Sequence, residues 1–119
     1  MRNRKKGSVP IFPIFDLKDC RKFTAGDLTT LREILRPVAK KRKKGSVPIF
    51  LRYSLAHATL KPGKTSLPHK LKTASEVYYI LKGTGKMHIN SESAPVRAGQ
   101  TIYIPPNSVQ FIKNTGKID

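Results

Sequence analysis

Alternating apolar and polar residues, in short runs separated by turns, fill most of the chain after residue 50. Side chains two residues apart in an extended strand point to the same face, so this alternation indicates strands with one buried face. The pattern predicts strands over residues 51–60, 69–72, 76–81, 86–90, 95–97, 101–104 and 109–113. Short strands at this spacing favour an all-β barrel or jelly roll.

Glycine and proline mark the turns between these strands. Residues 82–85 read Lys-Gly-Thr-Gly, and glycine accepts the positive φ that a hairpin turn requires. We therefore expect residues 86–90 to return alongside residues 76–81. Pro105 and Pro106 end the strand before them, because proline has no N–H to donate to a neighbouring strand.

Two motifs between residues 62 and 114 carry the candidate chemistry. The first consists of Gly63, five residues, His69, one residue, Leu71, four residues, Glu76, six residues and Gly83. The second consists of Gly99, five residues, Pro105, Pro106, Asn107, two residues, Gln110, three residues and Asn114. Together they resemble the cupin superfamily, whose motifs are G-x5-H-x-H-x3-4-E-x6-G and G-x5-P-x-G-x2-H-x3-N.

Every spacing fits the family pattern, while three residue types depart from it. Leu71 replaces the second histidine, Asn107 a glycine and Gln110 the last histidine. The resemblance, which is to small single-domain cupins likened to mannose-6-phosphate isomerase, implies the double-stranded β-helix or jelly-roll barrel of cupins. That barrel would cover residues 16–119, with its core motifs at residues 62–114, and residues 1–15 would form a basic and apolar N-terminal arm.

The ends of this barrel raise two structural questions. Residues 28–35 fit a short helical stripe with Asp27 as N-cap, whereas the resemblance makes them an early strand, which we expect. Cupins usually continue beyond the turn at residues 114–116, and the sequence stops at Asp119, so we expect a barrel lacking its last strand. An open edge favours pairing with another chain, and we therefore expect a homodimer.

His69, Glu76 and Gln110 occupy the positions at which cupins hold a divalent metal ion. The resemblance thus implies a site with an imidazole nitrogen, a carboxylate oxygen and an amide oxygen. Such ligands suit iron(II), manganese, nickel or zinc better than copper(I). Leu71 offers no donor, so water or substrate would complete the coordination, as a Lewis-acid catalyst requires.

The same residues also have a metal-free interpretation. A buried His69 hydrogen-bonded to Glu76, with Gln110 completing a polar cluster, would satisfy groups that burial removes from water. An apolar Leu71 on the inner face fits a barrel that has lost its metal. Both interpretations stay open at the level of sequence.

Four further side chains are candidates for the same site. Tyr78 and Tyr103 lie on predicted strands, where a phenol could orient or protonate a bound carbonyl group or could simply line the barrel wall. His57 and His88 could supply a fourth metal donor. His88 alternates with two core-like residues, so we expect it to face solvent.

These features indicate a small metal-binding cupin that binds a sugar-like or carboxylate small molecule, with a metal-dependent isomerase or epimerase reaction as one outcome. The alternative is a non-catalytic, metal-free ligand-binding cupin. Cupins include enzymes as well as storage and regulatory proteins, so the fold alone does not decide whether this chain is an enzyme.

Positive charge is the other strong signal, with 24 Lys and Arg against 7 Asp and Glu and a formal net charge of +17. The basic residues gather at residues 2–6 and 40–44, with a looser series at Lys61, Lys64, Lys70 and Lys72. Such runs can bind nucleic-acid phosphates or anionic substrates. No nucleic-acid-binding motif accompanies them, so nucleic acid is a lesser alternative partner.

The segment Arg-Lys-Lys-Gly-Ser-Val-Pro-Ile-Phe occurs at residues 4–12 and again at 42–50. Its flanks differ, which excludes a solenoid repeat, and we expect the first copy to lie against the barrel or a second subunit. Cys20 is the single cysteine, which excludes an intramolecular disulfide and fits a cytoplasmic setting. The run at residues 9–15 makes a poor signal peptide, and no stretch is long enough to span a membrane.

Overall fold

The computed structural model describes residues 13–36 and 53–119. The chain divides into two compact units, one made of Met1–Lys22 and Arg32–His57 and the other of Phe23–Leu31 and Ala58–Asp119. Both copies of the repeated segment, and the basic clusters at residues 2–6 and 40–44, lie outside the described residues. The expected contact of the first copy with the barrel or a second subunit therefore stays a prediction.

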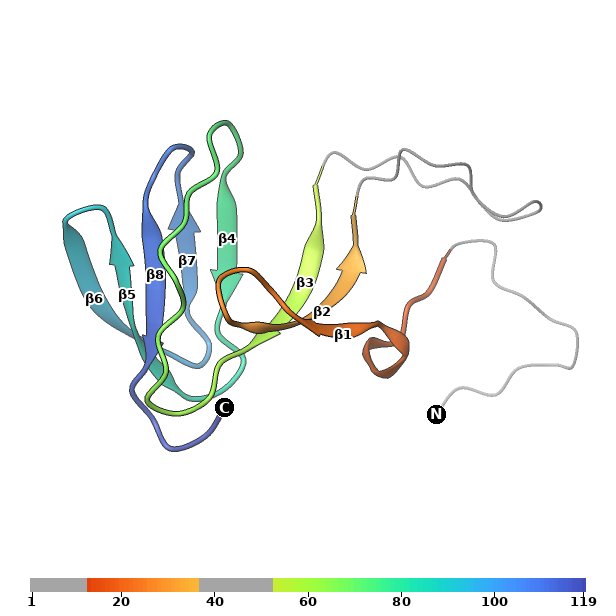
Figure 1. Ribbon diagram of the computed structural model, residues 1–119. Helices are drawn as coiled ribbons and strands as arrows, with labels where there is room; N and C mark the ends of the chain where they lie inside the picture. Colours follow the sequence, from red (N-terminus) through yellow and green to blue (C-terminus); the bar gives the residue numbers. More distant parts are fainter. Residues whose placement is uncertain (1–12, 37–52) are drawn as a thin grey trace, which may run out of the picture. The chain divides into compact units, whose positions relative to one another are not determined.

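Within the described residues, eight strands and one 3₁₀ turn make up the regular structure (Figure 1). In chain order the elements are η1 (Leu17–Asp19), β1 (Lys22–Thr24), β2 (Thr30–Leu35), β3 (Leu55–Thr59), β4 (Glu76–Tyr79), β5 (Thr84–Ile89), β6 (Glu92–Arg97), β7 (Thr101–Ile104) and β8 (Gln110–Asn114). They form three sheets with the strand orders β1-β2-β3, β4-β7 and β6-β5-β8. None of these sheets closes on itself, and the fold is all-β as predicted.

Sheets β4-β7 and β6-β5-β8 both contribute to the core of the second unit. Its buried apolar side chains are Met87, Val96 and Ile104. Partly buried side chains pack against them, namely Tyr78, Ile80, Ile89, Ile102 and Ile112. The alternation read from the sequence places these residues, because along each strand every second side chain points inward.

The predicted hairpin between residues 76–81 and 86–90 is wrong. Strand β4 instead pairs antiparallel with β7, with Glu76 opposite Ile104 and Tyr79 opposite Thr101, while β5 pairs with β6 and β8. Gly83 does take a positive φ of 80°. That turn joins strands of two different sheets, because a local bend fixes the direction of the chain but not the partner of the next strand.

Residues 69–72 were also expected to form a strand, and this expectation is wrong. The extended segment that lies beside β8 comes earlier, at residues 63–69, and follows that strand through successive backbone hydrogen bonds (Figure 1). Gly63 N–H donates to Asn114 O at 2.9 Å, Ser66 N–H to Ile112 O at 2.9 Å, and His69 N–H to Gln110 O at 3.1 Å. Only isolated bridges occur there, at Thr65 and His69, because prolines and turn residues interrupt the ladder.

Within the ambiguous residues 28–35, Thr30–Leu35 form strand β2, and no helix is present. Asp27 is no helix cap, since its Oδ1 accepts hydrogen bonds from Thr29 N–H at 3.1 Å and from Thr29 Oγ1 at 2.6 Å, closing a short turn before the strand. Leu28, at the tip of that turn, has a φ of 72°, a left-handed conformation that is rare for a branched side chain.

The described residues of the first unit include η1 and part of β2. Arg32 reaches back to this turn, and its Nη1 donates to Cys20 O at 2.9 Å. The Cys20 thiol forms no disulfide and donates a hydrogen bond to Asp16 O at 3.4 Å. Across the described parts of both units, no helix is long and apolar enough to cross a membrane.

Candidate functional site

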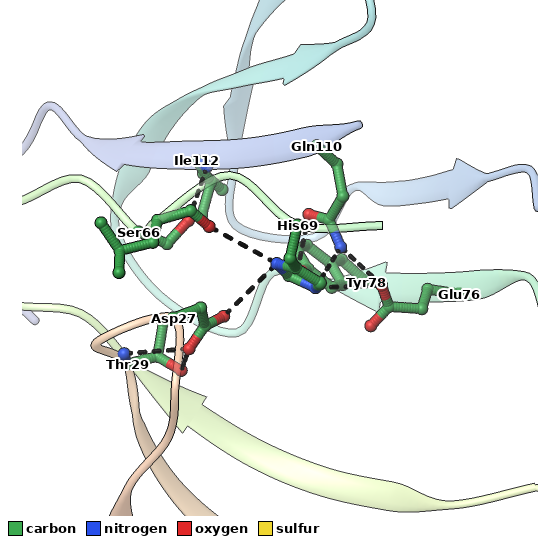
Figure 2. A network of polar contacts seen from close by, with 9 residues as sticks. Asp27, Thr29, Ser66, His69, Glu76, Tyr78, Gln110 and Ile112 are labelled. Atoms are coloured by element: carbon green, nitrogen blue, oxygen red, sulfur yellow. Dashed lines mark hydrogen bonds and ion pairs between the residues drawn. The ribbon is translucent and has the colours of Figure 1, made fainter. Parts of the chain in front are cut away.

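Three predicted site residues, His69, Glu76 and Gln110, converge in the second unit (Figure 2). His69 ends the segment that runs beside β8, Glu76 begins β4, and Gln110 begins β8. Two backbone hydrogen bonds hold His69 opposite Gln110, since each N–H donates to the other's carbonyl oxygen at 3.1 and 2.9 Å. The site therefore rests on main-chain pairing and not on loop conformation alone.

Gln110 is the centre of this cluster and is only 1% exposed. Its Nε2 donates to Glu76 Oε1 at 2.5 Å and lies 2.9 Å from His69 Nε2. Its Oε1 accepts a hydrogen bond from the Tyr78 hydroxyl at 3.0 Å. Every polar atom of the amide thus has a partner, as burial requires.

The contacts define the orientation of the Gln110 amide and the tautomer of His69. An ionised carboxylate only accepts hydrogen bonds, so the nitrogen of the amide must face Glu76. The same nitrogen faces His69 Nε2, which therefore acts as the acceptor. The imidazole proton then sits on Nδ1, whose neighbours are Leu67 O at 3.5 Å and Asp27 Oδ2 at 3.9 Å.

Tyr78 completes the inner face, because it lies two residues after Glu76 on β4. Burial, and then the negative charges of Glu76 and Asp27, raise the pKa of its hydroxyl to about 12, while the hydrogen bond to Gln110 lowers it. The phenol is protonated at neutral pH and acts as a donor to the amide, and the raised pKa extends this state into the alkaline range.

Asp27 brings a second carboxylate to the cluster from the turn before β2 (Figure 2). In the sequence, Asp27 stands out only as a possible helix cap. Neither cupin motif includes it, and it lies 42 positions before His69 in the printed sequence (69 minus 27). The one local signal is the Asp-x-Thr pattern of a side-chain-closed turn, which indicates the turn but not the contact with His69.

The other candidates lie elsewhere. Tyr103 is 59% exposed and alternates on β7 with the inward-facing Ile102 and Ile104. Leu71 is exposed, so it does not line an apolar inner face. His88 is half-buried and not open to solvent as expected, and it stacks on Phe111 with 4.2 Å between ring centroids.

His57 belongs to β3 and to the first unit. It therefore has no assigned place relative to the cluster in the second unit.

A metal ion would find a limited donor set here. Across residues 13–36 and 53–119 no group of three His, Cys, Asp or Glu side chains has the arrangement of a metal site, so Gln110 would have to serve as a ligand. His69 Nε2, Glu76 Oε1 and the Gln110 amide lie within 2.5 to 3.5 Å of one another. That spacing fits neighbouring ligands of one ion bound at roughly 2.1 Å, provided that the amide turns its oxygen inward.

Comparisons with known proteins give the family. The model of the Cupin domain family matches residues 56–118. An uncharacterized protein of Methanocaldococcus jannaschii is 37% identical over 98 residues, which is 82% of this chain and 72% of that protein. The oxalate-binding protein of Thermotoga maritima is 36% identical over 64 residues, and the match spans 54% of this chain and 53% of that protein.

A solved structure shows the same fold. The crystal structure of a predicted oxalate decarboxylase from Thermotoga maritima superposes with a TM-score of 0.70, over 89% of this chain and 90% of that one. The two sequences are 23% identical in this superposition, so the likeness concerns the fold alone. The motif spacings, the family match and the shared fold agree that this chain belongs to the cupin family.

Proposed function

We propose that this cupin binds a small carboxylate ligand through a divalent cation held by His69, Glu76 and Gln110. The observation that carries the proposal is the convergence of these side chains, whose facing atoms lie 2.5 to 3.5 Å apart. A cation in this position would act as a Lewis acid toward ligand oxygens. Three protein ligands would leave positions open for those oxygens.

The charges around the site support a cation. Glu76 and Asp27 approach the two sides of one imidazole, at 3.5 Å from Nε2 and 3.9 Å from Nδ1, and both side chains are less than a third exposed. Two carboxylates around one histidine repel an anionic ligand that arrives alone. A bound divalent cation would reverse this repulsion, so cation and carboxylate binding should be coupled.

The orientation of the Gln110 amide opposes cation binding. Its nitrogen now faces His69 and Glu76, and its oxygen faces Tyr78. Only the oxygen can coordinate a cation, so binding requires a half-turn of the amide, after which the nitrogen would face the Tyr78 hydroxyl. We therefore expect weak cation binding, in keeping with a neutral amide in place of a histidine.

Two similar proteins support a carboxylate as the ligand. One is an oxalate-binding protein and a structural neighbour is a predicted oxalate decarboxylase. Oxalate presents two carboxylates that can bind one cation together, which suits a site with open positions. A sugar-like ligand remains the alternative substrate class, and isomerase or epimerase turnover would be a property of the same metal-loaded site.

Calorimetric titration with Mn²⁺ or Zn²⁺, with and without oxalate, tests the proposal. We expect oxalate to bind only in the presence of the cation, Glu76→Ala to abolish both events, and Gln110→His to strengthen cation binding at least about tenfold. Glu92→Ala, an exposed carboxylate at the start of β6, is the matched control and should bind as the unaltered protein does. Oxalate binding that persists in chelator and in Glu76→Ala would contradict the proposal.

One observation favours a metal-free ligand-binding cupin as the second candidate. The described residues contain no buried side-chain polar atom without a partner, so the cluster is complete without a cation. In that case carboxylates and the imidazole would contact ligand hydroxyl groups directly, as a sugar-like ligand offers. Ligand binding without any cation, together with a lack of gain in Gln110→His, would decide for this candidate.

A further inference from the structure

We infer that Asp27 is a positioning residue for His69, and that its carboxylate faces Nδ1 so that Nε2 points to Glu76 and Gln110. The inference deepens the proposed function, on which it rests, because Nε2 is the atom that would hold the cation. Figure 2 shows the two carboxylates on opposite sides of the imidazole, Asp27 toward Nδ1 and Glu76 toward Nε2.

Hydrogen bonds to Thr29, and not the contact with His69, hold the carboxylate of Asp27 in place. Its Oδ1 accepts from Thr29 N–H at 3.1 Å and from the Thr29 hydroxyl at 2.6 Å, and Thr29 is itself buried. These bonds leave Oδ2 directed at Nδ1, 3.9 Å away. This separation is longer than a hydrogen bond, and such contacts in ligand-free sites often shorten when the site is occupied.

A second anchor ties the turn to the segment that carries His69. The backbone oxygen of Asp27 accepts a hydrogen bond from Leu67 N–H at 2.8 Å. Leu67 lies two residues before His69, so the same turn holds both the backbone of this segment and the side chain of the histidine. An ordinary turn before a strand needs neither contact.

The backbone next to Asp27 is strained. Leu28 has a φ of 72° although its side chain is 57% exposed, so little packing offsets the unfavourable conformation. The surrounding bonds impose it, since Leu28 N–H donates to Ala25 O at 3.0 Å and Ala25 N–H to Thr29 O at 2.8 Å. Strain of this kind concentrates at functional sites, where it fixes a side chain in place.

The role of Asp27 follows from the way in which metal-binding histidines are held. A histidine that holds a metal ion usually donates its other N–H to a carboxylate or carbonyl oxygen, which fixes the tautomer and the ring orientation. Here Asp27 and Leu67 O offer both kinds of acceptor to Nδ1. When the Gln110 amide reverses to bind a cation it no longer donates to Nε2, and only the Nδ1 side then holds the tautomer.

The His69 tautomer, measured by ¹H–¹⁵N NMR at pH 8 in the cation-free protein, tests this role without any metal. We expect the Nδ1–H form in the unaltered protein. Asp27→Asn keeps an oxygen for the Thr29 contacts but turns an amide nitrogen toward Nδ1. Two donors would then face each other, so part of the population should shift to Nε2–H. Glu92→Gln, the same change of carboxylate to amide at an exposed position at the start of β6, is the control and should leave the tautomer unchanged.

Calorimetric titration with Zn²⁺ provides the second readout. Asp27→Asn should weaken binding about 10- to 100-fold, the usual effect of removing such a partner. Thr29→Val removes the hydroxyl that holds Oδ1 and should weaken binding in the same direction by less. It also serves as the test variant if Asp27→Asn does not fold.

The outcomes separate this inference from the proposed function. An Nε2–H tautomer in the unaltered protein, or a tautomer and an affinity that neither Asp27→Asn nor Thr29→Val changes, would overturn the role of Asp27. If neither the unaltered protein nor Gln110→His binds a cation, the proposed function fails. A tautomer shift in Asp27→Asn would then still establish Asp27 as the residue that positions His69.

Discussion

The inner face of the second unit holds an apolar cluster and a polar cluster on neighbouring strands, and the two are stabilised in different ways. The apolar cluster of Met87, Val96 and Ile104 is stabilised by the area it removes from water, so its contributions scale with size. In the polar cluster around Gln110, stability depends on complete pairing, because a buried group that loses its partner costs more than the pair contributes.

Strand β8 carries both polar and apolar side chains on its inner face. Its inward positions are, in order, Gln110, Ile112 and Asn114, so a polar, an apolar and a polar side chain follow one another on one face. The amide of Asn114 donates to Leu60 O at 2.8 Å and to Ile118 O at 2.7 Å. Position on the inner face therefore predicts burial, while the available partners decide whether a polar residue can occupy it.

The largest expected effect comes from breaking the apolar cluster. Met87→Ala should lower the free energy of unfolding by about 3 kcal/mol, since it removes buried methylene groups and leaves a cavity in a small core. Urea unfolding followed by circular dichroism measures the change. Val77→Ala on the exposed face of β4 is the control, with an expected change of less than about 0.5 kcal/mol. Equal losses in the two variants would mean that the cluster is not the core.

Gln110→Leu should cost about 2 kcal/mol, although it adds apolar surface to the interior. Leucine is of comparable size but has no polar atom, so it leaves Tyr78 without its acceptor and Glu76 without its donor. The same unfolding assay measures the loss. A gain in stability would contradict the pairing described here. It would mean that buried apolar area stabilises this cluster, as it does the apolar cluster.

Tyr78→Phe removes only one hydroxyl and should cost about 1 kcal/mol. The matched control is Tyr79→Phe, one residue along β4, whose side chain points to the exposed face and should cost close to nothing. Unfolding of the two variants side by side isolates the hydrogen bond to Gln110. Indistinguishable midpoints would contradict the contact.

The last prediction concerns alkaline pH. The pKa of Tyr78 is raised from 10.0 to about 12 in the folded protein, so the unfolded chain loses this proton first. Its contribution to stability is complete below pH 10 and is lost as the pH rises toward 12. The loss of stability over this interval should be shallower in Tyr78→Phe than in Tyr79→Phe. A phenolate absorption step near pH 12 should also disappear only in the former.

The alternation of inward and outward side chains and the positions of several turns could be predicted from the sequence. The strand expected at residues 101–104 coincides with β7, because a glycine turn and two prolines bound it on either side. The motif spacings also led to the three residues that converge at the site. Local chemistry suffices for such features, since side chains two apart share a face and proline and glycine restrict the backbone.

The pairing of the strands and the contacts between distant side chains could not be predicted from local sequence and are visible only in the tertiary structure. β4 pairs with β7 and not with the strand that follows it, and Asp27 reaches His69 from a turn that no motif marks. The physical reason is that the backbone edge of one strand can pair with that of almost any other strand, and any carboxylate can accept from many donors. Local sequence therefore does not select the partner. Their partners are selected only when the whole set of apolar faces is buried together and every polar group left inside must find an acceptor or donor.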